Sequence, residues 1–168
     1  LLKRFGGIQK VAQASEAMLA QVPGIGPKKA AKIKAMTHWA LLLQEAEIGE
    51  TATIRSPADI ANLQMLEMSL LEREEMRVIL LNTKNRVLLV ETVYQGSLNT
   101  TVLRVSEVFR AAIINNAASI VLLHNHPSGD PTPSPEDVHV TEMIYEIGRG
   151  LNIAVLDHVI FAGNRYVS

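Results

Sequence analysis

The chain has 168 residues, of which 48% are hydrophobic and 20% charged, a balance typical of a folded globular protein rather than a disordered one. It contains no cysteine, which excludes disulfide bonds and thiolate zinc sites, so any metal ion must be held by histidine and carboxylate side chains. Residues 1–40 carry seven basic residues and one acidic residue, whereas residues 41–168 carry nine and sixteen, so the net charge of −1 conceals a strong asymmetry. This asymmetry indicates two modules, the first suited to a polyanion.

No apolar run approaches the roughly 20 residues that a transmembrane helix needs, and no signal-peptide pattern opens the chain. We therefore expect a soluble, cytoplasmic protein with no membrane partner. The first residue is Leu1 rather than Met, which is expected of a fragment of a longer protein. Nothing in the pattern indicates an oligomeric state.

Residues 1–46 predict a small all-α region. Short helical patterns occupy 8–14 and 16–20. Pro27 suits the first position of a longer helix, where its missing N–H group is not needed. Apolar residues then recur at helical spacing as far as Leu43, so the region reads as several helices joined by tight turns.

The turn over residues 22–26, Val-Pro-Gly-Ile-Gly, is the clearest feature of this region. Gly24 and Gly26 would let the backbone approach a phosphate closely, and the next helix presents free N–H groups and the positive end of its dipole. Lys28 and Lys29 add positive charge beside the same phosphate. The turn resembles the helix-hairpin-helix motif, which implies salt-sensitive DNA binding that does not depend on base sequence. The alternative is a plain turn between helices, because Pro-Gly pairs mark turns generally.

Residues 47–55 change composition and lose the helical period, so we predict a linker there and a second domain over 56–168. Ser56 and Pro57 predict the N-cap and first position of a helix that extends to about Glu72.

The second domain alternates helices and strands, which predicts a mixed sheet with helices packed on it, a fold of the α+β or mixed α/β class. The expected strands are 77–81, 86–94, 101–105, 120–123 and 153–161, with an edge piece over 164–167, and the expected helices are 107–115, capped by Ser106, and 135–148, capped by Ser134 and ended at Gly150.

The apolar strand before His124 leads into a motif rich in histidine, proline and glycine. Side chains alternate along a strand, so His124 and His126 point the same way and can hold one metal ion. The chain then turns into a helix whose first turn carries Asp137, a possible third ligand. Three protein ligands with a fourth position open for water are the arrangement of a catalytic zinc site.

The spacing of this motif is specific. His-x-His-Pro-x6-Ser-x2-Asp, formed here by His124, His126, Pro127, Ser134 and Asp137, resembles the JAMM motif of the MPN/JAB metallopeptidases. The longer text His-Asn-His-Pro-Ser-Gly-Asp-Pro-Thr-Pro-Ser resembles the bacterial RadC family of that superfamily. Three further segments carry the same resemblance: 80–86, 96–99 and 156–158. The family places a helix-hairpin-helix region before an MPN domain of cytidine-deaminase-like fold, and its N-terminal region is usually longer than here.

This resemblance implies a Zn2+ ion held by His124, His126 and Asp137. It implies that Ser134 steadies the tetrahedral intermediate or the water on the metal. The implied reaction is hydrolysis of a peptide or isopeptide bond in a peptide or protein substrate, associated with DNA through the N-terminal hairpin.

The resemblance also implies a glutamate that acts as general base and lies just before the first strand of the domain. Glu74 matches the expected offset to that strand best, so we assign it this role. Glu75, its neighbour, and Glu91, on the second strand, are the competing candidates.

Several of these residues also have simpler interpretations. Ser134 suits the N-cap of the following helix, and Asp137 suits the helix dipole, in each case without a metal. We expect His158 to be a hydrogen-bonded core histidine, Asn125 to bond loop backbone and Asp130 to form a turn.

Two other functions remain open. One is a DNA-repair-associated DNA-binding adaptor whose metal site is structural or vestigial. The other is a metal-dependent nuclease. The letters His-Asn-His match the name of a nuclease family, but that family spreads its residues over separate strands and a helix, so the contiguous triplet supports it weakly.

Overall fold

The computed structural model describes residues 1–96 and 104–168. These residues form two compact units, Leu1–Ala46 and Glu47–Ser168. Among the described residues, no helix combines the length and apolar character needed to cross a membrane.

The first unit is helical, as the sequence predicts. Its helices are α1 (Leu2–Phe5), α2 (Ile8–Gln13), α3 (Glu16–Ala20) and the start of α4 (Pro27–Thr51). A small buried core of Val11, Ala14, Leu19 and Ala30 holds them together. The predicted cap of α3 is confirmed, because the Ser15 side chain accepts a hydrogen bond from the N–H group of Met18.

Helix α4 continues to Thr51 and so passes through the first residues of the predicted linker. Residues 45–51 contain one residue that disfavours a helix, Gly49, and a glycine inside a helix costs only about 1 kcal/mol relative to alanine. The change of composition therefore does not end the helix.

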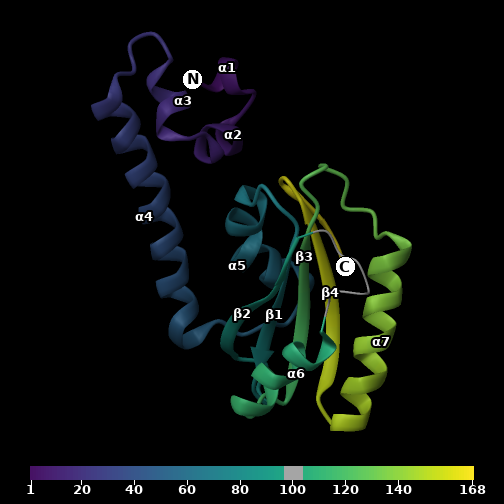
Figure 1. Ribbon diagram of the computed structural model, residues 1–168. Coiled ribbons are helices and arrows are strands. Elements are labelled where there is room, and N and C mark those ends of the chain that lie inside the picture. The colour runs from purple at the N-terminus through teal and green to yellow at the C-terminus, as the bar shows by residue number, and fades with distance from the viewer. Residues whose placement is uncertain (97–103) are drawn as a thin grey trace. The chain divides into compact units, whose positions relative to one another are not determined.

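The second unit is a five-stranded mixed sheet with helices on both faces, which confirms the predicted fold class (Figure 1). The strands are β1 (Glu75–Leu81), β2 (Val87–Gln95), β3 (Ser119–Asn125), β4 (Ala154–Ala162) and β5 (Arg165–Val167), in the spatial order β2-β1-β3-β4-β5. The helices are α5 (Pro57–Leu70), α6 (Val105–Ile114) and α7 (Pro135–Leu151). Among the strands of the described residues, only the β3–β4 pair is parallel, and α7 forms the crossover between those two strands.

The strands bury one set of side chains on each face, following the alternation of a strand. One apolar layer joins the sheet to α6 and α7, and it includes Val78, Leu80, Leu122, Val108 and Ile144. The other joins the sheet to α5, and it includes Ile79, Leu81, Leu123, Ile60 and Met68. Strand β3 is buried along its whole length and lies at the centre of the sheet. The residues that follow β3 therefore leave the sheet between β1 and β4.

The segment before α6 differs from the prediction. The sequence predicts a short strand over 101–105, of which 101–103 lie outside the described residues. Val105 is instead the first residue of α6, and the N-cap is Arg104 rather than Ser106. Valine is a residue type favoured in strands, but the Val105 side chain packs against the apolar layer under α6.

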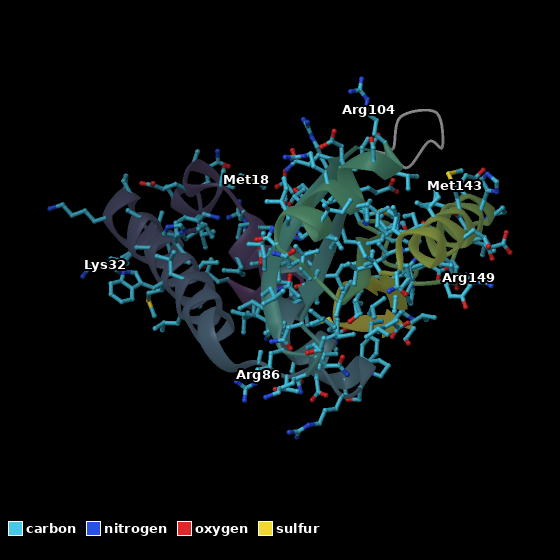
Figure 2. The ribbon with its side chains drawn as sticks, turned by 90° about the horizontal axis from the view of Figure 1, so that it is seen from below. Met18, Lys32, Arg86, Arg104, Met143 and Arg149 are labelled. Carbon is cyan, nitrogen blue, oxygen red and sulfur yellow. The ribbon has the colours of Figure 1, made fainter. Side chains whose placement is uncertain are left out.

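Helix α7 begins at the predicted residue and ends slightly later than predicted. Gly150 remains helical, and the chain leaves the helix at Asn152, whose φ of 59° is a left-handed conformation that asparagine tolerates. Arg149, on the outer side of the last turn (Figure 2), supplies positive charge at the helix end. Close packing needs Gly148, because a Cβ atom there would lie 2.7 Å from the carbonyl oxygen of Ile153. The absence of a side chain at Gly148 therefore lets α7 pack closely against the residue before β4.

Candidate metal centre

The C-terminal end of β3 carries the two histidines that the sequence predicts as ligands. His124 belongs to the strand and is 1% exposed. His126 follows it, and its backbone N–H group donates to the carbonyl oxygen of Phe161 in β4 at 2.7 Å. The two imidazole rings meet edge to face with centroids 4.8 Å apart.

Asp137, in the first turn of α7, completes this cluster and is also 1% exposed. Its Oδ1 atom lies 2.8 Å from Nδ1 of His124, and its Oδ2 atom lies 3.4 Å from Nε2 of His126. One potential ligand atom from each of the three residues lies within 4.8 Å of the others. The structure thus brings together the predicted ligand set, which could hold a metal ion.

Ser134 holds the Asp137 carboxylate in place through a capping box. Its Oγ atom accepts from the N–H group of Asp137 at 3.1 Å and donates to Oδ2 at 2.6 Å, and its own N–H group donates to Oδ2 at 2.7 Å. Burial opposes ionisation of Asp137, but hydrogen bonds from His124 and Ser134 outweigh it and hold the pKa of the carboxyl well below its usual range. The carboxylate is therefore charged at neutral pH.

The proton on His126 can be assigned from its partners. Nδ1 lies 2.8 Å from the carbonyl oxygen of Asp130, which only accepts, so Nδ1 carries the hydrogen. Nε2, the other nitrogen of the ring, lies 3.4 Å from Oδ2 of Asp137. A cation could bind between these two atoms. In His124 the Nε2 atom is buried and has no hydrogen-bond partner among the described residues.

This donor set fits a zinc ion. Two imidazole nitrogens and one carboxylate oxygen are ligands that zinc accepts, and a hydrogen bond from the far nitrogen of a ligating histidine is the usual way to orient its ring. The contact between His126 and the Asp130 carbonyl supplies such a bond.

Two further residues, Thr141 and His158, contact this cluster. Nδ1 of His158 lies 2.6 Å from the Thr141 hydroxyl, which donates to the backbone carbonyl of Asp137 at 2.6 Å. The His158 ring stacks on His124 with centroids 6.3 Å apart. Burial lowers the pKa of His158 to about 4, so this ring is neutral at pH 7. The sequence predicts a hydrogen-bonded core histidine here, but it does not single out Thr141, whose only signal is its position one helical turn after Asp137.

The three candidate glutamates have different surroundings. Met76 lies directly opposite His124 in the β1–β3 register, and opposite residues point to the same face of a sheet. Residues two apart in a strand also share a face, and Glu74 immediately precedes β1, two residues before Met76.

The other two glutamates are engaged in ion pairs. The Glu75 carboxylate accepts from the guanidinium of Arg77 at 2.9 Å and from the amide of Gln95 at 3.1 Å. Oε1 of Glu91 lies 3.7 Å from Nη2 of Arg110 in α6. Both carboxylates therefore have structural partners within the sheet and its covering helix.

A groove of about 490 Å³ opens beside Asp137, between α7 and the edge formed by β4 and β5. Its lining includes the exposed side chains of Val138, Tyr145 and Leu156, and the half-buried ring of His158. An apolar surface thus adjoins the cluster of ligands.

The hairpin of the first unit is a tight turn with an open backbone. Gly24 has a φ of 83°, a left-handed conformation that favours glycine. A Cβ atom on Gly24 or Gly26 would meet nothing within 4 Å, so a ligand could approach this backbone closely. Lys28 and Lys29 lie in the first turn of α4, and the Lys29 ammonium group donates to the carbonyl oxygen of Gly24 at 2.9 Å.

Comparison with known proteins agrees with both regions. Residues 54–168 match the model of the RadC-like JAB domain, and residues 7–35 match that of the helix-hairpin-helix motif. A protein from Roseiflexus castenholzii named UPF0758 protein is 49% identical over 168 residues, which are 100% of this chain and 72% of that protein. A UPF0758 protein from Chloroflexus aurantiacus is 47% identical over 168 residues, covering 100% of this chain and 73% of its own length. A UPF0758 protein from Caldanaerobacter subterraneus is 46% identical over 168 residues, covering 100% of this chain and 72% of its own length. The chain therefore belongs to the RadC family, with a helix-hairpin-helix motif followed by a RadC-like JAB domain.

Proposed function

We propose that this protein is a zinc-dependent hydrolase of peptide or isopeptide bonds that associates with DNA through its N-terminal hairpin. The observation that carries the proposal is the converging ligand set of His124, His126 and Asp137, in which Nε2 of His126 lies 3.4 Å from Oδ2 of Asp137. The types of these three side chains suit zinc.

The proposal assigns the metal to an imidazole nitrogen of each histidine and a carboxylate oxygen of Asp137. Zinc in such a site supplies Lewis acidity and lowers the pKa of bound water toward about 7. The depressed pKa of the Asp137 carboxyl keeps this ligand charged at neutral pH. The Ser134 hydroxyl, which bonds Oδ2 at 2.6 Å, and the Thr141 hydroxyl, which bonds the Asp137 carbonyl at 2.6 Å, orient the residue from both ends.

Glu74 is proposed as the general base. Its carboxylate would take the proton of the attacking water and return it to the amine that leaves, which are the two proton transfers that amide hydrolysis requires. Strand alternation favours its position on the His124 side of the sheet.

The groove beside Asp137 supports a peptide as substrate. Its apolar wall of Val138, Tyr145 and Leu156 could receive a side chain of an extended peptide whose scissile bond lies near the ligands.

Metal content and metal-dependent cleavage test the proposal together. The purified protein should hold about one zinc ion per chain by mass spectrometry of the metal. Incubated with a peptide library, it should produce new termini that disappear after chelation and return when zinc is restored. A protein that binds no zinc even after zinc is added would overturn the proposal.

A DNA-binding adaptor with a structural metal site is the second candidate, favoured by the helix-hairpin-helix match over residues 7–35. The same experiment separates the two functions. An adaptor would retain zinc and bind DNA but would cleave no peptide in the library.

The DNA contact has its own test. The double substitution Lys28→Glu with Lys29→Glu should weaken duplex binding and reduce the slope of log affinity against log salt by about 2, because each lysine–phosphate contact contributes about 0.9. Fluorescence anisotropy at several salt concentrations measures this slope. Lys84→Glu, an exposed charge change in the β1–β2 turn, is the matched control and should leave the slope unchanged. An unaltered slope in the double variant would place the DNA contact elsewhere.

A further inference from the structure

Asn125, the residue between the two histidines, is 3% exposed and bonds to a segment about 50 positions upstream. Its Oδ1 atom accepts from the N–H group of Glu75 at 2.6 Å, and its Nδ2 atom donates to the carbonyl oxygen of Arg73 at 3.0 Å. Only one orientation of the amide satisfies both partners, because an N–H group needs an acceptor and a carbonyl needs a donor. The two bonded backbone groups flank Glu74.

These bonds take over where the β1–β3 ladder stops. Met76 and His124 are the last pair in that register. Beyond them the Asn125 side chain, rather than the β3 backbone, holds the incoming chain. From the other side, the N–H group of Gly96 at the end of β2 donates to the carbonyl oxygen of Glu74 at 2.8 Å. Residues 73–75, where the chain enters β1, are therefore held from both sides.

We infer that Asn125 is a positioning residue for Glu74, which the proposed function makes the general base. The same short motif thus supplies the metal ligands and, through one side chain, fixes the backbone of the residue that handles the proton. This inference rests on the proposed function. A general base must sit within hydrogen-bond reach of the proton it takes, and a misplacement of about 1 Å can lower a rate by roughly 100-fold.

The chemistry of the contact explains why an amide is needed. A carboxylate at position 125 would keep an acceptor for the Glu75 N–H group but would present a second acceptor to the Arg73 carbonyl. A serine would be too short to reach both groups. Asparagine provides one donor and one acceptor in a plane, which reproduces the pairing of a neighbouring strand.

The test compares Asn125→Asp and Asn125→Ser with the unchanged full-length protein, all loaded with zinc. We expect kcat for peptide cleavage to fall about 100-fold with KM nearly unchanged, and zinc content to stay at about one per chain, because the amide bonds to the base segment and not to the ligands. Exchange of the Glu75 amide hydrogen should become at least tenfold faster in Asn125→Ser, while that of Leu122 in the middle of β3 stays slow. The matched control is Asn82→Asp. The Oδ1 atom of Asn82 accepts hydrogen bonds from the N–H groups of Lys84 and Arg86, and an aspartate oxygen can accept them equally well.

A double-variant cycle distinguishes positioning from general damage. In a Glu74→Gln background, Asn125→Asp should cause no further loss of kcat, because the group it positions is already disabled. A further 100-fold loss in that background would overturn the inference, as would an unchanged kcat in Asn125→Asp alone. If the unchanged protein binds no zinc or cleaves no peptide, the proposed function itself fails, and the role of Asn125 fails with it.

Discussion

Replacing Glu74 by Gln should lower kcat for peptide hydrolysis by about 10²–10⁴-fold, the usual contribution of a positioned general base, while the protein still holds about one zinc ion per chain. Glutamine has nearly the shape of glutamate but cannot accept the proton of water at neutral pH. The measurement is kcat and KM on a peptide identified from the library, with metal content determined on the same sample.

Glu91→Gln is the matched control for this substitution. Glu91 shares the sheet face of Val78, its partner in the β1–β2 register, but its carboxylate lies 3.7 Å from Arg110. We expect Glu91→Gln to change kcat by less than about threefold, because a pair this exposed contributes little. A large loss in Glu91→Gln with an active Glu74→Gln protein would transfer the role of base to Glu91.

Asp137→Asn should weaken zinc binding by at least about 100-fold, since the loss of a ligand exceeds the 10–100-fold effect of changing an outer hydrogen-bond partner. The neutral amide offers one oxygen in place of two. Its single oxygen cannot accept from both Ser134 and His124. The NH₂ group would therefore point at one of these two hydrogen-bond donors. Competition with a chromophoric chelator measures the affinity.

The same variant should also lower the free energy of unfolding of the metal-free protein, by about 1–3 kcal/mol for each buried donor left without a partner. Urea denaturation measures this loss. Asp130→Asn is the matched control, because Asp130 is an exposed acid in the same loop whose side chain acts only as an acceptor toward Thr132. Equal zinc affinities for the two variants would show that Asp137 is not a ligand.

The sequence alone predicts those features that depend on local geometry. His124 and His126 share a side because strand side chains alternate, and Ser134 caps the helix that carries Asp137 because its hydroxyl reaches a backbone N–H group only three residues away. The caps at Ser15 and Ser56 follow from the same short-range contact. These interactions lie within a few residues, so the pattern of residue types suffices.

Local pattern is a weaker guide where tertiary contacts decide. It predicts a strand through Val105 that the packing of α6 turns into a helix start. It also predicts a linker from residue 47, whereas α4 continues to Thr51, because a single glycine in a polar stretch weakens a helix without ending it.

The assignment of the glutamates shows most clearly what the sequence lacks. Glu74 and Glu75 are neighbours with the same chemistry, and only tertiary contacts distinguish their surroundings. Glu75 begins β1 opposite Gln95, whereas Glu74 precedes the strand. The bonds from Asn125 to the backbone on either side of Glu74 join residues about 50 positions apart. Such contacts have no sequence signal, because closing a long loop leaves no periodicity in the residues between. The sequence thus determined the ligand motif, whereas the tertiary structure decided the partners of the candidate carboxylates, because the pairing of β1 with β2 and β3 brings together residues that lie far apart in the chain.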